Sequence, residues 1–162
     1  MSCLICERIQ WIKEHRNPYF VCELETGYVV MGDHQRFRGY TLFLCKVHEE
    51  ELYHLEKNFK LKYLEEMTLV AEAVANVYHP QKMNYEVLGN GDSHLHFHLF
   101  PRRAGDLGSY GNQGKGPVWW LPREEMWNDQ DKLSKDELNA QTKLLKEEIL
   151  RLKERKQKNE NC

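Results

Sequence analysis

The chain has 162 residues, of which 41% are hydrophobic, and this suits one domain of ordinary size with its own core. It carries 23 Lys and Arg against 25 Asp and Glu, a near-neutral balance that gives no reason to expect nucleic acid or a membrane surface as a partner. No apolar run approaches the roughly 20 residues that span a bilayer, and the first ten residues lack the pattern of a secretory signal, so we expect a cytoplasmic protein.

The amino-terminal part of the chain predicts one helix followed by three strands. Apolar residues at helical spacing indicate a short helix over residues 7–15, and Pro18 follows the end of this pattern. Turn-forming residues then separate three runs that are rich in β-branched and aromatic residues. These runs predict strands over residues 19–24, 28–31 and 40–45.

A long amphipathic helix, or two helices in line, is predicted over residues 48–78, where apolar residues recur at every third or fourth position and Pro80 stops the pattern. A strand over residues 83–90 then turns at Gly89 to Gly91 into a strand with three histidines. The short links between these elements favour antiparallel pairing over repeated βαβ units. We therefore expect an α+β fold with an antiparallel sheet of about five strands.

The last part of the chain predicts a loop, an aromatic segment and a helix. Half of the ten glycines lie between Gly105 and Gly116, which is typical of a mobile surface loop. The tryptophans that follow could close a pocket, cover an interface or fill the core, and we favour core or interface. These are Trp119, Trp120 and Trp127. From Ser134 a capping-box pattern starts a charged helix with one apolar stripe, formed by Leu138, Leu145, Ile149 and Leu152.

The segment "HLHFHLFPRR" alternates histidines with large apolar residues. In a strand, His94, His96 and His98 share one face and the apolar residues between them fill the other, whereas a helix would scatter them. Three purely structural histidines would need three separate polar partners on one half-buried face. A single metal ion bound by all three is disfavoured because the outer two lie roughly 13 Å apart along a strand, although one His-x-His pair could hold zinc with a third ligand. The arginines after this strand are expected at the surface, among them Arg102.

The amino-terminal "CLIC" admits three interpretations. The five cysteines are odd in number and lack the spacing of a disulfide framework, so we expect reduced thiols. A redox Cys3-x-x-Cys6 would follow a strand of a βαβ unit, and the residues before Cys3 are too few for one. Zinc would need two further ligands, and small apolar residues in a frayed terminus are the third interpretation.

Several segments together resemble one family. "HLHFHLF" resembles the His-φ-His-φ-His-φ-φ signature, with φ apolar, of the histidine triad (HIT) family of nucleotide-binding hydrolases and transferases. "RGYTLFLCKVHEEEL" resembles the family's glycine, strand and histidine-led helix, and "PRRAGD" is similar to its dinucleoside polyphosphate hydrolase branch. The resemblance covers about residues 3 to 106 and implies a HIT-like catalytic domain over residues 1–128. Residues 129–162 then form a C-terminal amphipathic helix and charged tail.

The resemblance also implies a mechanism and its residues. His96 is expected to attack the α-phosphorus of a nucleotide conjugate and form a covalent nucleotidyl-histidine, while His98 binds the phosphate or helps to protonate the leaving group. Asn90 and Asp33 fall near the family's positions for phosphate and ribose, with plain turn residues as the alternative. The expected substrates are dinucleoside polyphosphates or related conjugates, and the expected assembly is a homodimer that joins two sheets into one.

A subset of the family that carries such a CxxC completes a zinc site with two histidines. By this resemblance the ligands are Cys3, Cys6, His48 and His94. Such a set fills all four tetrahedral positions, so the zinc is expected to be structural, and no organic cofactor is expected. Two other functions stay open: a nucleotide-binding regulator with little turnover, and a metal-dependent hydrolase that uses triad histidines as ligands.

Overall fold

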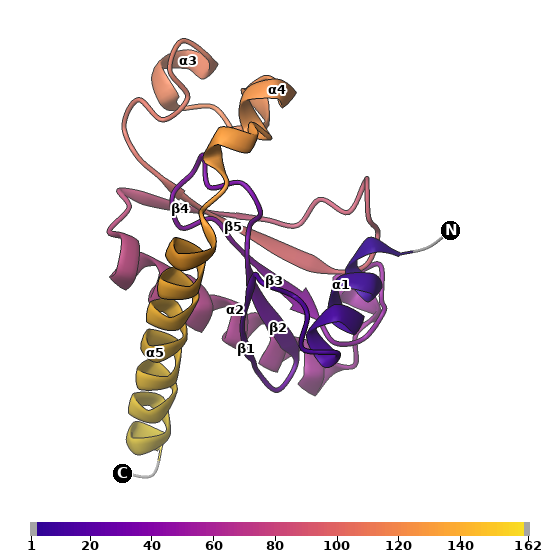
Figure 1. Cartoon of the computed structure of the whole chain (residues 1–162). Coiled ribbons are helices and arrows are strands. Elements are labelled where there is room, and N and C mark those ends of the chain that lie inside the picture. Colours follow the sequence, from indigo (N-terminus) through magenta and orange to yellow (C-terminus); the bar gives the residue numbers. More distant parts are fainter. Residues whose placement is uncertain (1–2, 161–162) are drawn as a thin grey trace.

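The computed structural model describes residues 3–160, apart from the side chains of residues 112, 113 and 160. Five antiparallel strands form one sheet in the order β1-β2-β3-β5-β4, and helices cover both of its faces (Figure 1). The expected α+β fold is therefore confirmed. The strands are β1 (Phe20–Glu23), β2 (Gly27–Met31), β3 (Thr41–Cys45), β4 (Lys82–Glu86) and β5 (His96–Arg102). The helices are α1 (Leu4–Lys13), α2 (Lys57–Tyr78), α3 (Gly111–Gly114), α4 (Arg123–Met126) and α5 (Lys135–Glu160).

The two faces of the sheet have different coverings. Leu95, Phe97 and Leu99 point into the main core, which α2 and α5 complete. On the opposite face, apolar residues of α1 pack against Tyr28 and Val30 of β2 and against β3. The alternation predicted for the histidine strand is thus correct for its apolar residues. Because α1 packs over β2 and β3, it leaves the histidines of β5 beside it rather than beneath it.

The long helix begins later than its periodicity predicts. α2 starts at Lys57, where the Glu56 carboxylate caps the backbone N–H groups of the first turn, and residues 46–56 form a loop with one 3-10 turn. The expected start at residue 48 is wrong because this loop bonds to the histidine strand instead: the Leu95 N–H donates to the Glu49 carbonyl at 2.8 Å. The strand expected over residues 83–90 is also shorter, since β4 ends at Glu86 and residues 87–95 connect it to β5.

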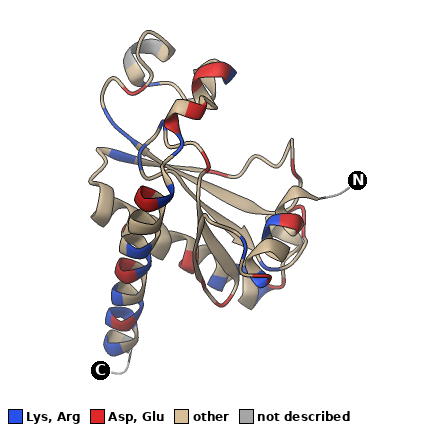
Figure 2. Ribbon diagram, in the orientation of Figure 1, with Lys and Arg blue, Asp and Glu red and all other residues tan. Residues whose placement is uncertain are grey.

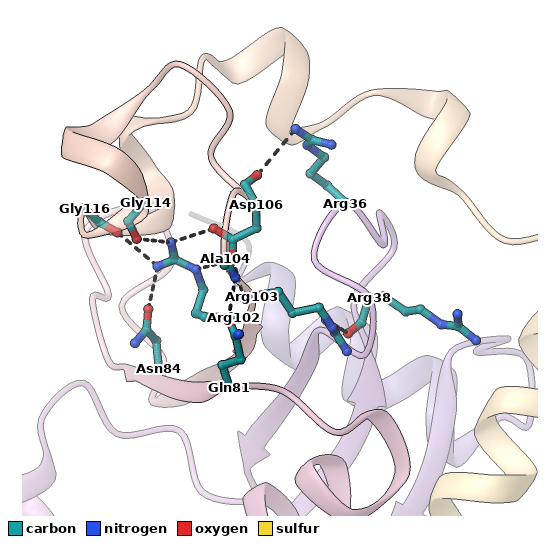
Figure 3. A network of polar contacts seen from close by, with 10 residues as sticks. All are labelled: Arg36, Arg38, Gln81, Asn84, Arg102, Arg103, Ala104, Asp106, Gly114 and Gly116. Atoms are coloured by element: carbon teal, nitrogen blue, oxygen red, sulfur yellow. Dashed lines mark hydrogen bonds and ion pairs between the residues drawn. The ribbon is translucent and has the colours of Figure 1, made fainter.

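Arg102 organises the segment that follows β5 (Figure 3). Its guanidinium donates to Asp106 at 2.7 and 2.9 Å, to the Asn84 side chain at 2.8 Å and to the Gly116 carbonyl at 3.0 Å. Arg102 is buried, so the expectation of a surface residue is wrong. The glycine-rich segment is likewise more than a surface loop, because Leu107 is fully buried. These bonds fold the segment back onto β4 and β5.

The C-terminal helix has the predicted start and stripe. The Ser134 N–H donates to the Glu137 carboxylate at 2.9 Å and the Glu137 N–H donates to the Ser134 hydroxyl at 3.4 Å, so both halves of the expected capping box are present. Along α5 the exposed face carries interspersed positive and negative side chains (Figure 2). No helix within residues 3–160 is both long and apolar enough to cross a membrane. The apolar stripe packs in the main core through Leu138, Leu145, Ile149 and Leu152.

Candidate active site and metal centre

His94 lies just before β5 and is held by the neighbouring strand. Its Nε2–H donates to the Cys45 carbonyl at 2.8 Å, and its Nδ1 lies 3.6 Å from the Cys3 Sγ and 3.4 Å from the Cys6 Sγ. Burial lowers the pKa of His94, so its imidazole is neutral at pH 7. The bond to Cys45 therefore leaves a lone pair on Nδ1 that points at two thiols.

The four residues expected as metal ligands come together at this point. Cys3 caps the first turn of α1, and His48 follows β3 with its Nδ1 3.1 Å from the Cys6 Sγ. The four ligand atoms lie within 4.8 Å of one another. Tetrahedral zinc with bonds of about 2.3 Å to sulfur and 2.0–2.1 Å to nitrogen would place such atoms about 3.5 Å apart. The cluster could therefore hold a metal ion, and its donor set is one that zinc prefers.

His96 has the opposite arrangement of its two nitrogens. Its Nδ1 lies 2.7 Å from the His94 carbonyl, an acceptor, so the ring proton is on Nδ1. The Nε2 has no hydrogen-bond partner among the described residues, although the side chain is only 7% exposed. An imidazole with an accessible, unpaired Nε2 can act as a nucleophile through that nitrogen.

His98 is neutral and faces a buried tyrosine. Burial lowers the pKa of His98 to about 3, and its Nδ1 lies 2.6 Å from the Tyr40 hydroxyl. Burial also raises the pKa of Tyr40, so this hydroxyl keeps its proton. If the phenol donates to Nδ1, its only proton has a partner, whereas the reverse arrangement would leave that buried proton unpaired. The geometry thus favours a His98 whose proton sits on Nε2.

The sequence interpretation missed Tyr40 and underrated Trp119. Tyr40 stacks on Phe100 with ring centroids 4.1 Å apart, which fixes its hydroxyl toward His98. Trp119 lies edge-on to His98 at 5.7 Å and donates its indole N–H to Glu86. Trp119 and Trp120 are 39% and 56% exposed, so core packing is wrong for these two residues. The only sequence signal for Tyr40 was its place at the start of a strand run.

Two cavities meet at His96. The first, of about 320 Å³, has apolar walls from α1, β2 and β3, and Trp127 closes one side. Its size falls within the range of about 300–1,000 Å³ that small-molecule sites occupy. It contains His96, His98 and Asp33, and the Asp33 carboxylate accepts two hydrogen bonds from Arg8 at 2.8 and 2.7 Å.

The second cavity, of about 210 Å³, lies between the loop before α2 and the connection from β4 to β5. Its walls include Asn90 and Ser93 from the connection and Glu50 and Glu51 from the loop. His96 lines both cavities. The structure therefore places Asp33 and Asn90 in the walls of two different cavities that share His96, rather than in one pocket.

Comparison with known proteins gives a family match over the part of the chain that carries the sheet and the three histidines. The model of the HIT domain matches residues 16–105, more than half of the sequence. Comparison with curated proteins gives no significant match. The C-terminal helix and the tryptophan-rich segment lie outside the matched residues.

Solved structures share the fold. A histidine triad (HIT) protein from Sinorhizobium meliloti 1021 is 20% identical with a TM-score of 0.67, over 83% of this chain and 93% of that one. A hypothetical histidine triad nucleotide-binding protein from Sulfolobus tokodaii strain7 is 21% identical with a TM-score of 0.65, over 91% and 94%. A Zn-bound histidine triad family protein from Mycobacterium smegmatis is 19% identical with a TM-score of 0.60, over 95% and 97%.

Proposed function

The chain belongs to the histidine triad (HIT) family, and from this premise we propose that it is a nucleotide hydrolase or nucleotidyltransferase acting through a covalent nucleotidyl-His96. Its substrates would join a nucleoside monophosphate to a leaving group through the α-phosphorus. Dinucleoside polyphosphates and nucleoside phosphoramidates both have this connection. The observation that carries the proposal is the unpaired Nε2 of His96 at the meeting point of two cavities.

The proposed reaction has two displacements. The Nε2 lone pair of His96 bonds to the α-phosphorus, and the bond from phosphorus to the leaving group breaks with its electron pair passing to the leaving atom, which takes a proton from water. A water molecule then attacks the same phosphorus, releases His96 and yields the nucleoside monophosphate. The net change is hydrolysis of one bond. If a second nucleophile replaces this water, the outcome is transfer.

His98 and the first cavity would position the substrate. With its pKa near 3, His98 is neutral at pH 7 and suits the role of hydrogen-bond donor to a phosphate oxygen better than that of proton donor to the leaving group. The apolar walls and Trp127 fit a nucleoside base, and Asp33 can accept hydrogen bonds from ribose hydroxyls while it holds Arg8. Asn90 lies in the second cavity and would face the leaving group.

The metal cluster would have a structural role. We propose zinc as its ion, because two cysteines and two histidines form a closed tetrahedral set with no position left for water or substrate. When bound, zinc would supply a cross-link among α1, the loop after β3 and the start of β5. His94 would then anchor the strand that carries His96, while the chemistry proceeds without the ion.

A homodimer that joins two sheets is the proposed assembly. β4 is an edge strand whose described neighbour in the sheet is β5 alone, so its outer backbone groups can pair with a second copy. Large apolar side chains are exposed on and after this strand, which supports an interface there. They are Tyr85, Val87 and Leu88.

Intact-protein mass spectrometry tests the covalent step. The protein is mixed with a dinucleoside polyphosphate or a nucleoside phosphoramidate and quenched rapidly without acid, because an N-phosphoryl histidine is labile in acid. We expect a nucleotidyl adduct in the wild type and none in His96→Ala. Turnover that persists in His96→Ala without an adduct would disprove the mechanism, and nucleotide binding without any turnover would identify a regulator instead.

A further inference from the structure

The charges around His96 are unevenly distributed between its two cavities. Glu50 and Glu51 line the second cavity, and the Glu50 carboxylate accepts a hydrogen bond from the Ser93 hydroxyl at 3.1 Å. Asp33 and Asp92 line the first cavity. Among the described lining residues of both cavities there is no lysine, and Arg8 is the one arginine.

Arg8 is not free to bind a phosphate chain. Both of its terminal nitrogens donate to the Asp33 carboxylate, at 2.8 and 2.7 Å, in a bidentate pair that is half-buried. The pair is close to electrically neutral as a unit. Three carboxylates therefore remain without a cationic partner in the walls: Asp92, Glu50 and Glu51. A polyphosphate placed here would meet like charge on several sides.

The second cavity is the enclosed space that we assign to the leaving group. The first cavity is the more apolar of the two and suits the nucleoside, as argued above. His96 is nine-tenths buried and lines both cavities, and its Nε2 has no hydrogen-bond partner among the described residues. A phosphorus bonded to Nε2 with its nucleoside in the first cavity leaves the second as the adjoining enclosed space for the departing group.

We propose that the second cavity selects a leaving group that carries a positive charge, and that Glu50 and Glu51 determine this specificity. The inference rests on the proposed function, since it assigns a substrate class to the same site. Exposed carboxylates attract a cation modestly but over several ångströms, and they repel an anionic chain by a similar amount. The preferred substrates are then nucleoside phosphoramidates of cationic amines rather than dinucleoside polyphosphates.

The chemistry balances without a further reactant. The Nε2 of His96 bonds to phosphorus, the P–N bond breaks, and its electron pair and a proton from water go to the departing nitrogen. Water then hydrolyses the nucleotidyl-His96. The products are the nucleoside monophosphate and a free amine, and the second, cationic nitrogen of that amine is unchanged throughout.

Matched substrates provide the test. Adenosine 5′-phosphoramidates of diaminopropane, propylamine and β-alanine present a cationic, a neutral and an anionic leaving group of similar length. We expect kcat/KM to fall in that order, by about tenfold from the first to the second, and the difference to shrink as salt is added. Diadenosine tetraphosphate, without added divalent cation, should be slower than the cationic amidate.

Charge-removing variants locate the effect. In Glu50→Gln and Glu51→Gln the ratio of kcat/KM between the cationic and neutral amidates should fall toward one. Glu49→Gln is the matched control, because Glu49 lies in the same loop, does not line the cavity, and has its carboxylate 3.7 Å from the Nδ1 of His54. This control should keep the wild-type ratio.

The possible failures are distinguishable. A wild-type ratio near one, a ratio that both variants leave unchanged, or faster turnover of the tetraphosphate would overturn the charge preference while leaving the proposed function intact. Absence of turnover for every substrate, with no adduct on His96, would overturn the proposed function itself.

Discussion

Two neighbouring histidines of one strand segment have opposite surroundings. His94 donates its Nε2 proton to the Cys45 carbonyl and directs Nδ1 at two thiols. His96 donates its Nδ1 proton to the His94 carbonyl and leaves Nε2 unpaired at the meeting of two cavities. The residue type and the face of the strand are the same. What differs is the ring nitrogen that is hydrogen-bonded to a backbone carbonyl, which is Nε2 in His94 and Nδ1 in His96.

This difference shows how one motif can serve two purposes. A backbone carbonyl fixes the tautomer of each ring, and the tautomer decides where the lone pair points. The lone pair of His94 points to the cluster that could hold a metal ion, whereas His96 lines two cavities and its Nε2 is unpaired among the described residues. The comparison predicts different effects of substitution at the two sites. Loss of His96 should reduce catalysis, and loss of a residue in the metal cluster should reduce stability.

The largest expected effect is on the chemical side. His96→Ala should reduce kcat by about four orders of magnitude or more, because it removes the atom that bonds to phosphorus. Metal content should stay unchanged, and the melting temperature should fall by only a few degrees through the lost bond to the His94 carbonyl. Steady-state kinetics, metal analysis and thermal unfolding check this together. Loss of metal in this variant would mean that the two histidines are not separable.

The next effect is on the structural side. Cys6→Ser should abolish stoichiometric zinc binding and lower the melting temperature by roughly 10 °C, as expected when several kcal/mol of metal-linked stability are lost. The turnover of the molecules that remain folded should fall far less than in His96→Ala. Cys22→Ala is the matched control, since Cys22 is buried in the main core away from the cluster. Unchanged stability after zinc removal would contradict a structural role.

Local periodicity predicted much of the fold around these sites. The alternation that buries Leu95, Phe97 and Leu99 and the apolar stripe along α5 are each visible as a regular spacing within one segment of the sequence. Predicting them required no knowledge of distant contacts. The start of α2 could not be read in this way. The loop before it is apolar at helical spacing, yet its backbone bonds to Leu95, a residue more than forty positions away.

Long-range pairing also explains what was missed in the site. Tyr40 meets His98, 58 residues further along, only because β3 lies beside β5 with Leu42 opposite His98. Arg102 is buried because carbonyls of a later segment fold back onto it. For the CxxC, the residues alone left three interpretations open, and only the family resemblance named His48 and His94 as its partners.

A pH-dependent effect should follow from the burial of His98. Its pKa is about 3 in the folded protein against an ordinary value of 6.5, so between these values the unfolded chain binds a proton that the folded chain does not. The titration of His98 therefore leaves the free energy of unfolding unchanged above about pH 6.5 and lowers it progressively as the pH falls toward 3. Lowering the pH from 7 to 5 should reduce the free energy of unfolding of the wild type more than that of His98→Gln. Equal losses would show that His98 titrates normally.

The smallest expected effect concerns Tyr40, which is expected to position His98 through its hydroxyl. Tyr40→Phe keeps the stacking on Phe100 but removes the proton donated to Nδ1, so the His98 proton can move from Nε2 to Nδ1. We expect kcat to fall about tenfold, equivalent to about 1.4 kcal/mol, with KM changed less.

Tyr63→Phe separates this role from a loss of stability. Tyr63 is also buried, and its hydroxyl donates to the Phe43 carbonyl at 3.1 Å in the main core, on the face of the sheet opposite the histidines. Both variants lose one buried hydrogen bond and should unfold at similarly lowered temperatures. Only Tyr40→Phe should also change the ¹⁵N chemical shifts of His98, which report its tautomer. If the two variants lose kcat equally, or if the His98 shifts do not move, the tyrosine does not fix the tautomer, and the orientation of His98 must come from packing against Phe100 and Trp119 alone.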